Sequence, residues 1–338
     1  MRIGVDVMGG DNAPDEILKG CIAVLPRLAA DDRLVMIGDR GVIEEGIRER
    51  GVSDPRLEIV GTTQVIGMDD PPVEAVRERM DSSIVVMAKL ASPKTPNRLD
   101  AVVSAGNTGA CVAAAQLHMR RLPNVLRPGI AVTVPTFAGP VLFIDVGANI
   151  EPKPHHLAQY GVMGDVYAKQ IMGLTNPRVA LMNVGGEEQK GTSDMKEARD
   201  LLRAASNLNF IGYVEGRGVF DGEADVVITD GVVGNVMLKL AEGLSSGIFK
   251  ALAHEVFAID PELAVRLEPV VKSLYAKHDY HEYGGAPLLG VNGVCLISHG
   301  SSEGRTIMNA VIRARNVVIS GVNEAISQRL AEMADVPA

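Results

Sequence analysis

Small polar residues stand next to glycine at six places along the chain, each time after a run of apolar residues. The six segments are 6–11, 104–109, 145–149, 183–191, 229–235 and 299–302. Each apolar run predicts a buried strand, and in open α/β sheets ligands bind beyond the carboxyl ends of the strands. Glycine-rich turns at such ends expose backbone N–H groups, which suit a phosphate or a developing oxyanion. Together the six segments predict the floor of one anion-binding cleft.

The candidate substrate-binding residues come from four of these segments. Most of them are glycines or carry short polar side chains: Asp6, Gly10, Asp11, Gly106, Asn107, Thr108, Gly109, Asp145, Asn149, His299, Gly300, Ser301 and Ser302. In segment 104–109 the two glycines permit a tight turn, and Asn107 or Thr108 can cap the helix predicted to follow. The start of that helix adds a partial positive charge that favours an anion. Asp6 and Asp145 end their strands and can either form turns or order the site.

Lys190 and Asn235 are the candidate catalytic residues. Lys190 is the one lysine within the six segments, and it can face a bound phosphate or a substrate carbonyl. On charge alone a solvated surface lysine is the more common case, but the place of Lys190 between Gly186 and Gly191 at a strand end favours a role in the site. Asn235 begins a predicted helix, where it can donate a hydrogen bond to substrate or act as an ordinary N-cap. Phosphate is itself a nucleophile, and no activated Ser or Cys pair is visible. The sequence therefore gives no support for a covalent intermediate on an enzyme side chain.

Other nucleophile and metal patterns receive less support. A catalytic triad built on His299 with Ser301 or Ser104 lacks the GxSxG elbow that usually carries such a serine. Cys111 falls in the first turn of a predicted helix, where a thiol pKa can drop, but its apolar surroundings favour a buried, unreactive residue. His155 and His156 are adjacent and point to different faces of a helix, so no metal site is expected.

Motif searches and net charge narrow the ligand classes. The sequence contains no GxxxxGK[ST] P-loop, and no GxGxxG fingerprint follows the first predicted strand, so no nucleotide or other cofactor is expected. With 33 basic and 42 acidic residues the formal net charge is −9. An acidic chain argues against a general nucleic-acid partner.

Strand and helix patterns alternate along nearly the whole chain. This alternation predicts an α/β fold of three layers, α/β/α, around a mostly parallel sheet, organised as one domain over residues 1–338. Two apolar strands at 130–135 and 140–145 are so close that they predict one antiparallel hairpin. Two long helices, within 232–277, predict a helical hairpin.

Composition indicates a protein of a reducing compartment. The core must use Val, Ile, Leu, Ala and Met, because Trp is absent and aromatic residues are few. Cys21, Cys111 and Cys295 are far apart in apolar stretches, which favours free, buried thiols over disulfides.

The N-terminus runs directly into a predicted strand without a signal peptide, and no apolar run reaches the 18 to 20 residues, roughly, of a spanning helix. We expect a cytoplasmic location.

The motifs taken together resemble the phosphate acyltransferase (PlsX) family. The segments that carry the resemblance are 8–11, 104–110, 145–149, 183–191, 284–290 and 299–302, with Gly234-Asn235 and Asn309-Ala310. The resemblance runs in order from residue 3 to about residue 320, and the combination is far more specific than any single motif.

The resemblance implies a reaction and several partners. Members of this family move a long acyl group from acyl carrier protein to inorganic phosphate, giving acyl-phosphate for bacterial phospholipid synthesis. It also implies a homodimer, peripheral contact with the membrane, and a fold like phosphotransacetylases and isocitrate dehydrogenases. Two other functions stay open: a dehydrogenase or short-chain phosphotransacetylase on the same fold, and a non-catalytic phosphate- or lipid-binding protein.

Two surface segments are candidates for macromolecular contacts. Val256, Phe257, Ile259 and Leu263 cluster at the tip of the predicted helical hairpin, where they can be buried in a dimer or lie in a lipid interface. A basic segment, 118–127, carries three arginines that can attract an acidic carrier protein or simply complement a helix C-terminus.

Overall fold

The computed structural model describes residues 1–136, 138–277 and 284–334. Its strands are β1 (Arg2–Asp6), β2 (Arg33–Gly38), β3 (Leu57–Gly61), β4 (Ala101–Ser104), β5 (Gly129–Thr136), β6 (Gly139–Ile144), β7 (Val179–Met182), β8 (Phe210–Val214), β9 (Val226–Ile228), β10 (Ala286–Leu289) and β11 (Val294–Ile297). Strands and helices alternate over most of the chain, as the sequence predicts.

The helices differ widely in length. They are α1 (Asp15–Ala23), α2 (Arg40–Glu49), α3 (Pro72–Glu78), α4 (Ser83–Leu90), α5 (Thr108–Ala114), α6 (Pro154–Gln170), α7 (Ser193–Ala204), α8 (Gly216–Phe220), α9 (Gly231–Ile259), α10 (Pro261–Lys277), α11 (Gly304–Ser320) and α12 (Val322–Ala334), with a 3₁₀ turn η1 (Leu25–Arg27) and a π-helical turn η2 (Ala115–Met119). One helix is predicted over 302–330, but Gly321 adopts φ +69° and separates α11 from α12.

The strands form one sheet in the order β3-β2-β1-β4-β11-β10-β5-β6-β9-β7-β8. Neighbouring strands are parallel except at β10, which runs antiparallel to β11 and β5, and between β5 and β6. The mostly parallel sheet and the β5–β6 hairpin confirm the predictions, whereas β10 was not predicted. Because of these reversals, the strands from β6 to β8 run opposite to those from β3 to β11.

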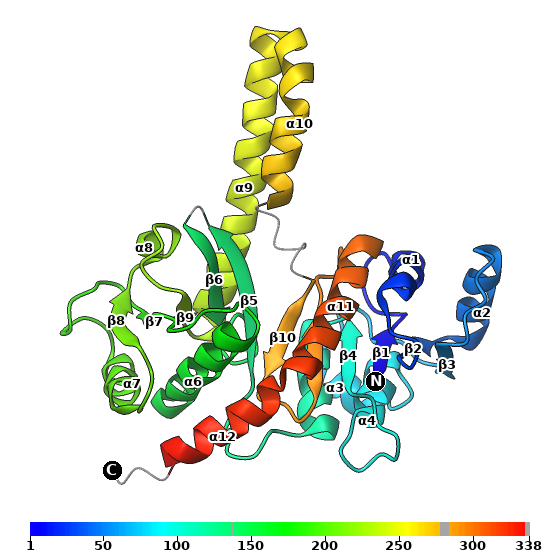
Figure 1. Ribbon diagram of the computed structural model, residues 1–338, viewed down its shortest axis with the longest axis horizontal. Coiled ribbons are helices and arrows are strands. Elements are labelled where there is room, and N and C mark those ends of the chain that lie inside the picture. The colour runs from blue at the N-terminus through cyan, green and yellow to red at the C-terminus, as the bar shows by residue number, and fades with distance from the viewer. Residues whose placement is uncertain (137, 278–283, 335–338) are drawn as a thin grey trace.

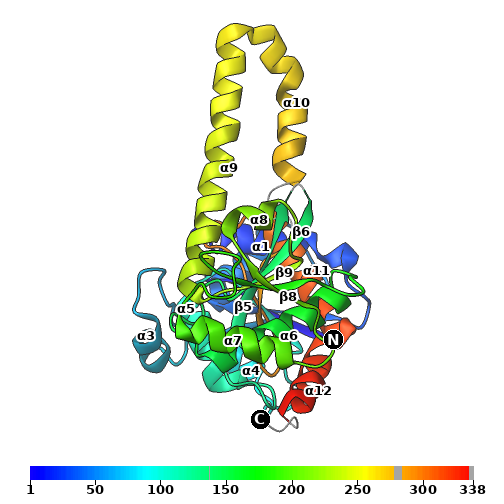
Figure 2. The same cartoon turned by 90° about the vertical axis from the view of Figure 1, so that its left-hand side faces the viewer.

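Helices cover both faces of the sheet (Figures 1 and 2). Along β2, Leu34 and Met36 join a core shared with α1, α6, α11 and α12, while Val35 and Ile37 join a second core shared with α3, α4 and α5. This alternation is the period of two that a strand imposes on its side chains. The predicted three-layer α/β/α architecture is confirmed.

The α9–α10 hairpin projects from the body of the molecule (Figures 1 and 2). At 1.5 Å per residue, the 29 residues of α9 span about 43 Å. A ridge of apolar side chains with a spacing of four residues is exposed along α9: Val236, Leu240, Leu244, Ile248 and Leu252. In the part of the chain that is described, no helix combines the length and apolar character needed to cross a membrane.

The middle of the sheet opens where β10 meets β5. These strands pair only at Leu288 with Ile130 and at Leu289 with Gly129, so the rest of β5 continues without β10 beside it. The opening lies between the two oppositely directed halves of the sheet. It provides the space in which the candidate site is found.

Candidate active site

The loops after β1 and β4 are joined by a buried carboxylate. Asp6, fully buried, accepts hydrogen bonds from Ser104 Oγ at 2.7 Å and from the backbone N–H of Met8 at 3.1 Å. Burial raises the pKa of Asp6, and these hydrogen bonds oppose that rise. The sequence left open whether Asp6 forms a turn or orders the site. The contacts show that it holds two of the predicted loops together.

Asn107 caps α5 and is held by its surroundings. Its Oδ1 accepts from the N–H of Ala110 at 3.0 Å, and its Nδ2 donates to the carbonyl oxygens of Met68 at 2.9 Å and Asp70 at 3.0 Å. Gly109 has the ring of Pro72 beside the place where a Cβ would stand. The polar atoms of Asn107 therefore bind the protein itself.

The loop after β11 packs on the same group of loops. Asp11 N–H donates to the carbonyl oxygen of Gly300 at 2.8 Å, and Gly10 lies against Gly300 and Ala105. Gly106 is buried beside Asp6. The ends of β1, β4 and β11 therefore form a first loop group at one edge of the sheet, as the sequence predicts for these three strands.

The loops after β6 and β9 form a second group. Asp145, fully buried, accepts from the N–H groups of Ile130 at 2.9 Å and Asn149 at 2.7 Å. Burial raises the pKa of Asp145. The carbonyl oxygen of Asn149 accepts from Gly231 N–H at 2.8 Å, and a Cβ at Gly234 would stand 2.1 Å from the carbonyl oxygen of Asp145. Only glycine lets α9 begin this close to the loop.

The prediction that all six segments share one edge is wrong. The two halves of the sheet run in opposite directions, so the carboxyl ends of β6, β7 and β9 lie at the other edge. Helix α9 connects the two groups, because it begins in the second and passes across to the first. There Lys239 Nζ lies 2.9 Å from Nε2 of His299.

A cavity of about 130 Å³ lies between α9, β5 and the ends of β10 and β11. A single water molecule needs roughly a tenth of that volume. Its apolar walls include Ile130, Val132, Val146, Leu238 and Ile297. Its polar groups include Thr108, Asn235, Lys239, Glu242, Ser298 and His299. Of the residues predicted from sequence, Thr108, Asn235 and His299 line this cavity, and the other predicted residues are not part of its lining.

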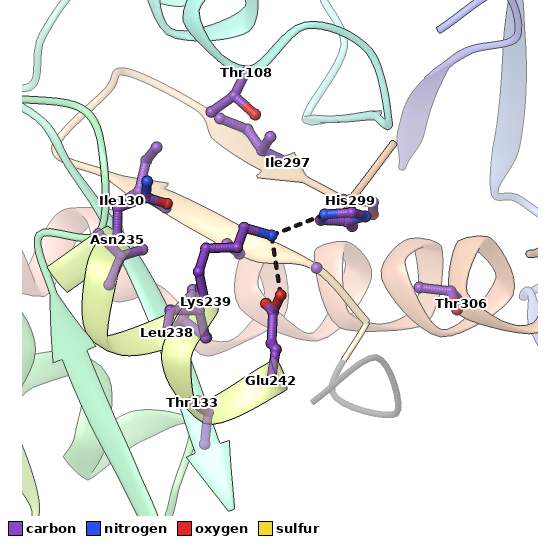
Figure 3. Close-up of a pocket in the computed structure, with 15 residues that line it drawn as sticks. Thr108, Ile130, Thr133, Asn235, Leu238, Lys239, Glu242, Ile297, His299 and Thr306 are labelled. Atoms are coloured by element: carbon purple, nitrogen blue, oxygen red, sulfur yellow. Dashed lines mark hydrogen bonds and ion pairs between the residues drawn. The ribbon is translucent and has the colours of Figure 1, made fainter. Parts of the chain in front are cut away.

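Lys239 is held in the cavity by two partners (Figure 3). Its Nζ lies 3.0 Å from Oε2 of Glu242 and 2.9 Å from Nε2 of His299. An ammonium group can only donate, so Lys239 is the donor toward His299. At the other ring nitrogen, the backbone N–H of Ser301 donates to Nδ1 of His299 at 3.2 Å, and Oγ of Ser301 lies 2.7 Å from the same nitrogen. Lys239, His299 and Ser301 thus form one chain of polar contacts.

Two lining residues carry polar atoms that are available to a ligand. Oγ of Ser298 and Oε1 of Glu242 are buried and have no hydrogen-bond partner among the described residues. Buried polar atoms are nearly always paired, so such exceptions need an explanation. The Ser298 hydroxyl and the Lys239 ammonium are donors that would suit an anion, and the apolar walls suit a hydrocarbon group.

Sequence reasoning missed Lys239, Glu242 and Ser298. A helical spacing could have found the first two, because Asn235, Lys239 and Glu242 stand at i, i+4 and i+7 and therefore share one helix face. Ser298 ends the predicted strand directly before His299. The position of a side chain at the opening beside β10 could not be read from the sequence, because β10 itself was not predicted.

Lys190 lies outside the lining of the cavity. It is half exposed on the loop between β7 and α7, with its Nζ 3.9 Å from Oε1 of Glu187. The same loop is tied to α7, since Arg199 and Arg203 both donate to Glu188. The catalytic role predicted for Lys190 stays a prediction.

The three cysteines are free and buried, as the sequence predicts. Burial raises the pKa of the Cys21 and Cys295 thiols to about 12, and it raises that of Cys111 further. Cys111 is therefore a neutral thiol at physiological pH. Among the described residues, no group of three or more His, Cys, Asp or Glu side chains is placed to hold a metal ion.

Comparison with known sequences shows the family. The family model described as "Fatty acid synthesis protein" matches residues 1–325. A phosphate acyltransferase of Desulfitobacterium hafniense is 44% identical over 333 residues, which cover 98% of each chain. The chain belongs to the phosphate acyltransferase (PlsX) family. A further member, from Bacillus licheniformis, is 41% identical over 338 residues, which cover 99% of this chain and all of that one.

Solved structures support the fold. A phosphotransacetylase from Streptococcus pyogenes matches with a TM-score of 0.61 at 16% identity, covering 94% of both chains. The EutD phosphotransacetylase from Staphylococcus aureus matches with a TM-score of 0.60 at 15% identity, covering 96% of this chain and 94% of that chain. The phosphotransacetylase-like fold implied by the sequence resemblance is confirmed. Membership of the family makes the protein an acyltransferase that acts in fatty acid and phospholipid synthesis with phosphate as acceptor.

Proposed function

We propose that the protein transfers a long-chain fatty acyl group from acyl carrier protein to inorganic phosphate at the cavity beside α9. One observation carries the proposal. The cavity places an ammonium group and an unpartnered serine hydroxyl, of Lys239 and Ser298, beside apolar walls. Phosphate needs hydrogen-bond donors and positive charge, whereas a fatty acyl group needs apolar contact, and both requirements are met within one cavity.

The reaction needs no covalent enzyme intermediate. A phosphate oxygen attacks the thioester carbonyl carbon, the new C–O bond forms, and the C–S bond breaks to release the carrier thiolate, which takes up a proton. Lys239 offsets the negative charge of phosphate, and Asn235 and Ser298 donate to phosphate or to the oxyanion. Cys111 takes no part, because its buried thiol is neutral.

Lys190 remains a second candidate for the same electrostatic role. Its ammonium group is half exposed and paired only loosely with Glu187, so its contact with phosphate requires its loop to approach the cavity. The turnover of the Lys190→Ala and Lys239→Met variants, measured side by side, separates the two assignments. A large loss at Lys190 alone would favour the loop residue.

Homodimer formation and peripheral membrane contact are proposed for the hairpin. The apolar ridge of α9 presents large side chains at a spacing that packs helix against helix. At the tip, Phe257 is 60% exposed and Ile259 is 81% exposed, and Leu263 lies nearby on α10. We assign the ridge to the dimer and the tip to the lipid interface, where a membrane-bound enzyme could receive the acyl-phosphate product.

Carrier-protein docking is proposed for the basic segment at the far end of α5 and η2. Arg120 and Arg121 follow η2 directly, and Arg127 lies in the loop that leads to β5. The reversal of all three charges should raise KM for the acyl carrier protein substrate and flatten its salt dependence, while KM for phosphate stays unchanged. Equal changes in both KM values, or no change in either, would place docking elsewhere, with Lys89, Lys94 and Arg98 next to be tested.

The donor test separates this proposal from the alternatives. The purified protein is given palmitoyl-acyl carrier protein, palmitoyl-coenzyme A or acetyl-coenzyme A with phosphate, and acyl-phosphate is trapped with hydroxylamine. A parallel assay follows NAD reduction. The proposal expects acyl-phosphate with the carrier-protein donor at the highest kcat/KM. A preference for acetyl-coenzyme A would favour a short-chain phosphotransacetylase. Reduction of NAD would favour a dehydrogenase, and binding without turnover would favour a non-catalytic protein.

A further inference from the structure

A second, narrower crevice adjoins the cavity on the other side of Leu238. Its volume is about 10 Å³, roughly that of one water molecule. Five of its wall residues are Val134, Phe143, Phe220, Met237 and Ala241. All of the side chains that line it are apolar, so none of them offers a hydrogen-bond partner for phosphate or for the thioester carbonyl.

The crevice and the cavity share two wall residues, Val146 and Leu238. The geometry of α9 explains this arrangement. Asn235 and Lys239 stand on the face directed to the cavity, and Met237 and Ala241 stand on the next face, with Leu238 between them. The same two turns of α9 therefore present polar side chains to the cavity and apolar side chains to the crevice.

We infer that this crevice is the acyl-chain subsite, which takes the hydrocarbon tail of the thioester donor. The inference rests on the proposed function, because it needs a fatty acyl donor in the neighbouring cavity. A chain that starts at the carbonyl near Lys239 passes Leu238 and Val146 and enters the crevice between α9 and the β5–β6 hairpin. No polar group of the lining has to lose its water on the way.

Some side chains around the crevice are fixed and others can rotate. We expect this difference to set the length of the acyl chain that the crevice accepts. Phe143 and Val134 are buried strand residues of the sheet, and they form a fixed floor. Met237 has an unbranched thioether side chain that changes shape at low cost. Phe220, at the end of α8, is 40% exposed and stands at the solvent side. Rotation of Met237 and Phe220 widens the crevice, and the floor determines how many methylene groups are buried.

Ala241 provides the sharpest test, because it is a small residue of the α9 wall. Ala241→Phe fills the crevice, and Ala253→Phe is the matched control, because Ala253 is an exposed alanine of the same helix that lines neither the cavity nor the crevice. Acyl-phosphate formation is measured with palmitoyl and butyryl thioesters of the same carrier. Each buried methylene contributes about a fourfold gain, so exclusion of three of them lowers kcat/KM for palmitoyl by about 50-fold. The butyryl value should stay within about threefold of wild type, and Ala253→Phe should match wild type with both substrates.

A widening variant keeps the inference testable if Ala241→Phe fails to fold. Met237→Ala should raise the ratio of palmitoyl to butyryl kcat/KM or extend the range to longer chains. An unchanged ratio in a folded Ala241→Phe or Met237→Ala protein, with the wild type active, overturns the acyl-chain subsite and leaves the proposed function intact. A wild-type protein that forms no acyl-phosphate from any thioester overturns both.

Discussion

Replacement of Lys239 by methionine removes the cation of the cavity and keeps an unbranched side chain of similar length. A unit charge about 4 Å from a phosphate oxygen contributes about 1 kcal/mol in water and about 4 kcal/mol at an effective dielectric constant near 20. The Lys239 side chain is 47% exposed, so solvent screens it partly. We therefore estimate that the Lys239 charge contributes roughly 2 to 3 kcal/mol to the interaction with phosphate. Loss of this contribution lowers kcat/KM for phosphate by about 30- to 150-fold.

The assay varies phosphate at saturating acyl donor and then varies the donor at saturating phosphate. A binding role of Lys239 predicts that the loss appears mainly as a higher KM for phosphate, with KM for the donor little changed. Lys250→Met is the matched control, because Lys250 is an exposed lysine on the same helix, away from the cavity. Its kinetic constants should equal those of the wild type.

Two outcomes would refute this reasoning. If folded Lys239→Met keeps wild-type constants for both substrates, the cavity cation does not bind phosphate. If both KM values rise by the same factor, together with a loss of thermal stability, Lys239 supports the fold through Glu242 and His299 and makes no specific contact with phosphate.

Three further predictions concern other parts of the molecule. A double variant with Asp at Phe257 and Ile259 should release the protein from lipid vesicles without loss of turnover on soluble substrate; dissociation of the dimer instead would assign the tip to the subunit interface. Burial lowers the pKa of His156 to about 4, so between pH 6.5 and 4 the unfolded chain binds a proton that the folded chain does not. The His156 ring is only partly buried, so solvent screening reduces the effect, and chemical denaturation should show a wild-type loss of about 1 kcal/mol between pH 7 and pH 5 that His156→Gln lacks; equal losses would be inconsistent with it. Cys111→Ala should turn over like wild type, and a trapped acyl group on Cys111 would contradict direct attack by phosphate.

The sequence predicted the layers of the fold well, because periodicity reports burial directly. Alternating strand and helix patterns gave the three layers, and the short spacing between 130–135 and 140–145 gave the β5–β6 hairpin. Strand β10 was not predicted because it is only four residues long, contains Pro287, and follows residues of turn-forming type. Because β10 is antiparallel to both neighbours, β5 runs in the same direction as β11, and the reversal of the strands from β6 to β8 comes from the β5–β6 hairpin. The edge at which each loop lies depends on this order of strands across the sheet, which no local pattern in the sequence encodes.

The candidate site was predicted only in part. Glycine-rich segments identified Thr108, Asn235 and His299, because turn chemistry is visible in local sequence. Lys190 was selected because it lies among glycines, and Lys239 was missed because a helical lysine has the pattern of a solvated residue. What places Lys239 in the cavity is a tertiary contact, the passage of α9 from one loop group to the other, and no local pattern encodes it.

The most direct test of the account is the fate of ³²P-labelled phosphate in a reaction with a long-chain acyl thioester. The purified protein should place label in an acyl-phosphate that hydroxylamine discharges, with one thiol released for each labelled product. Lys239→Met should lower both yields together at low phosphate. Release of thiol without transfer of label would mean that water, and not phosphate, attacks the thioester, and it would contradict the assignment of the cavity as a phosphate site.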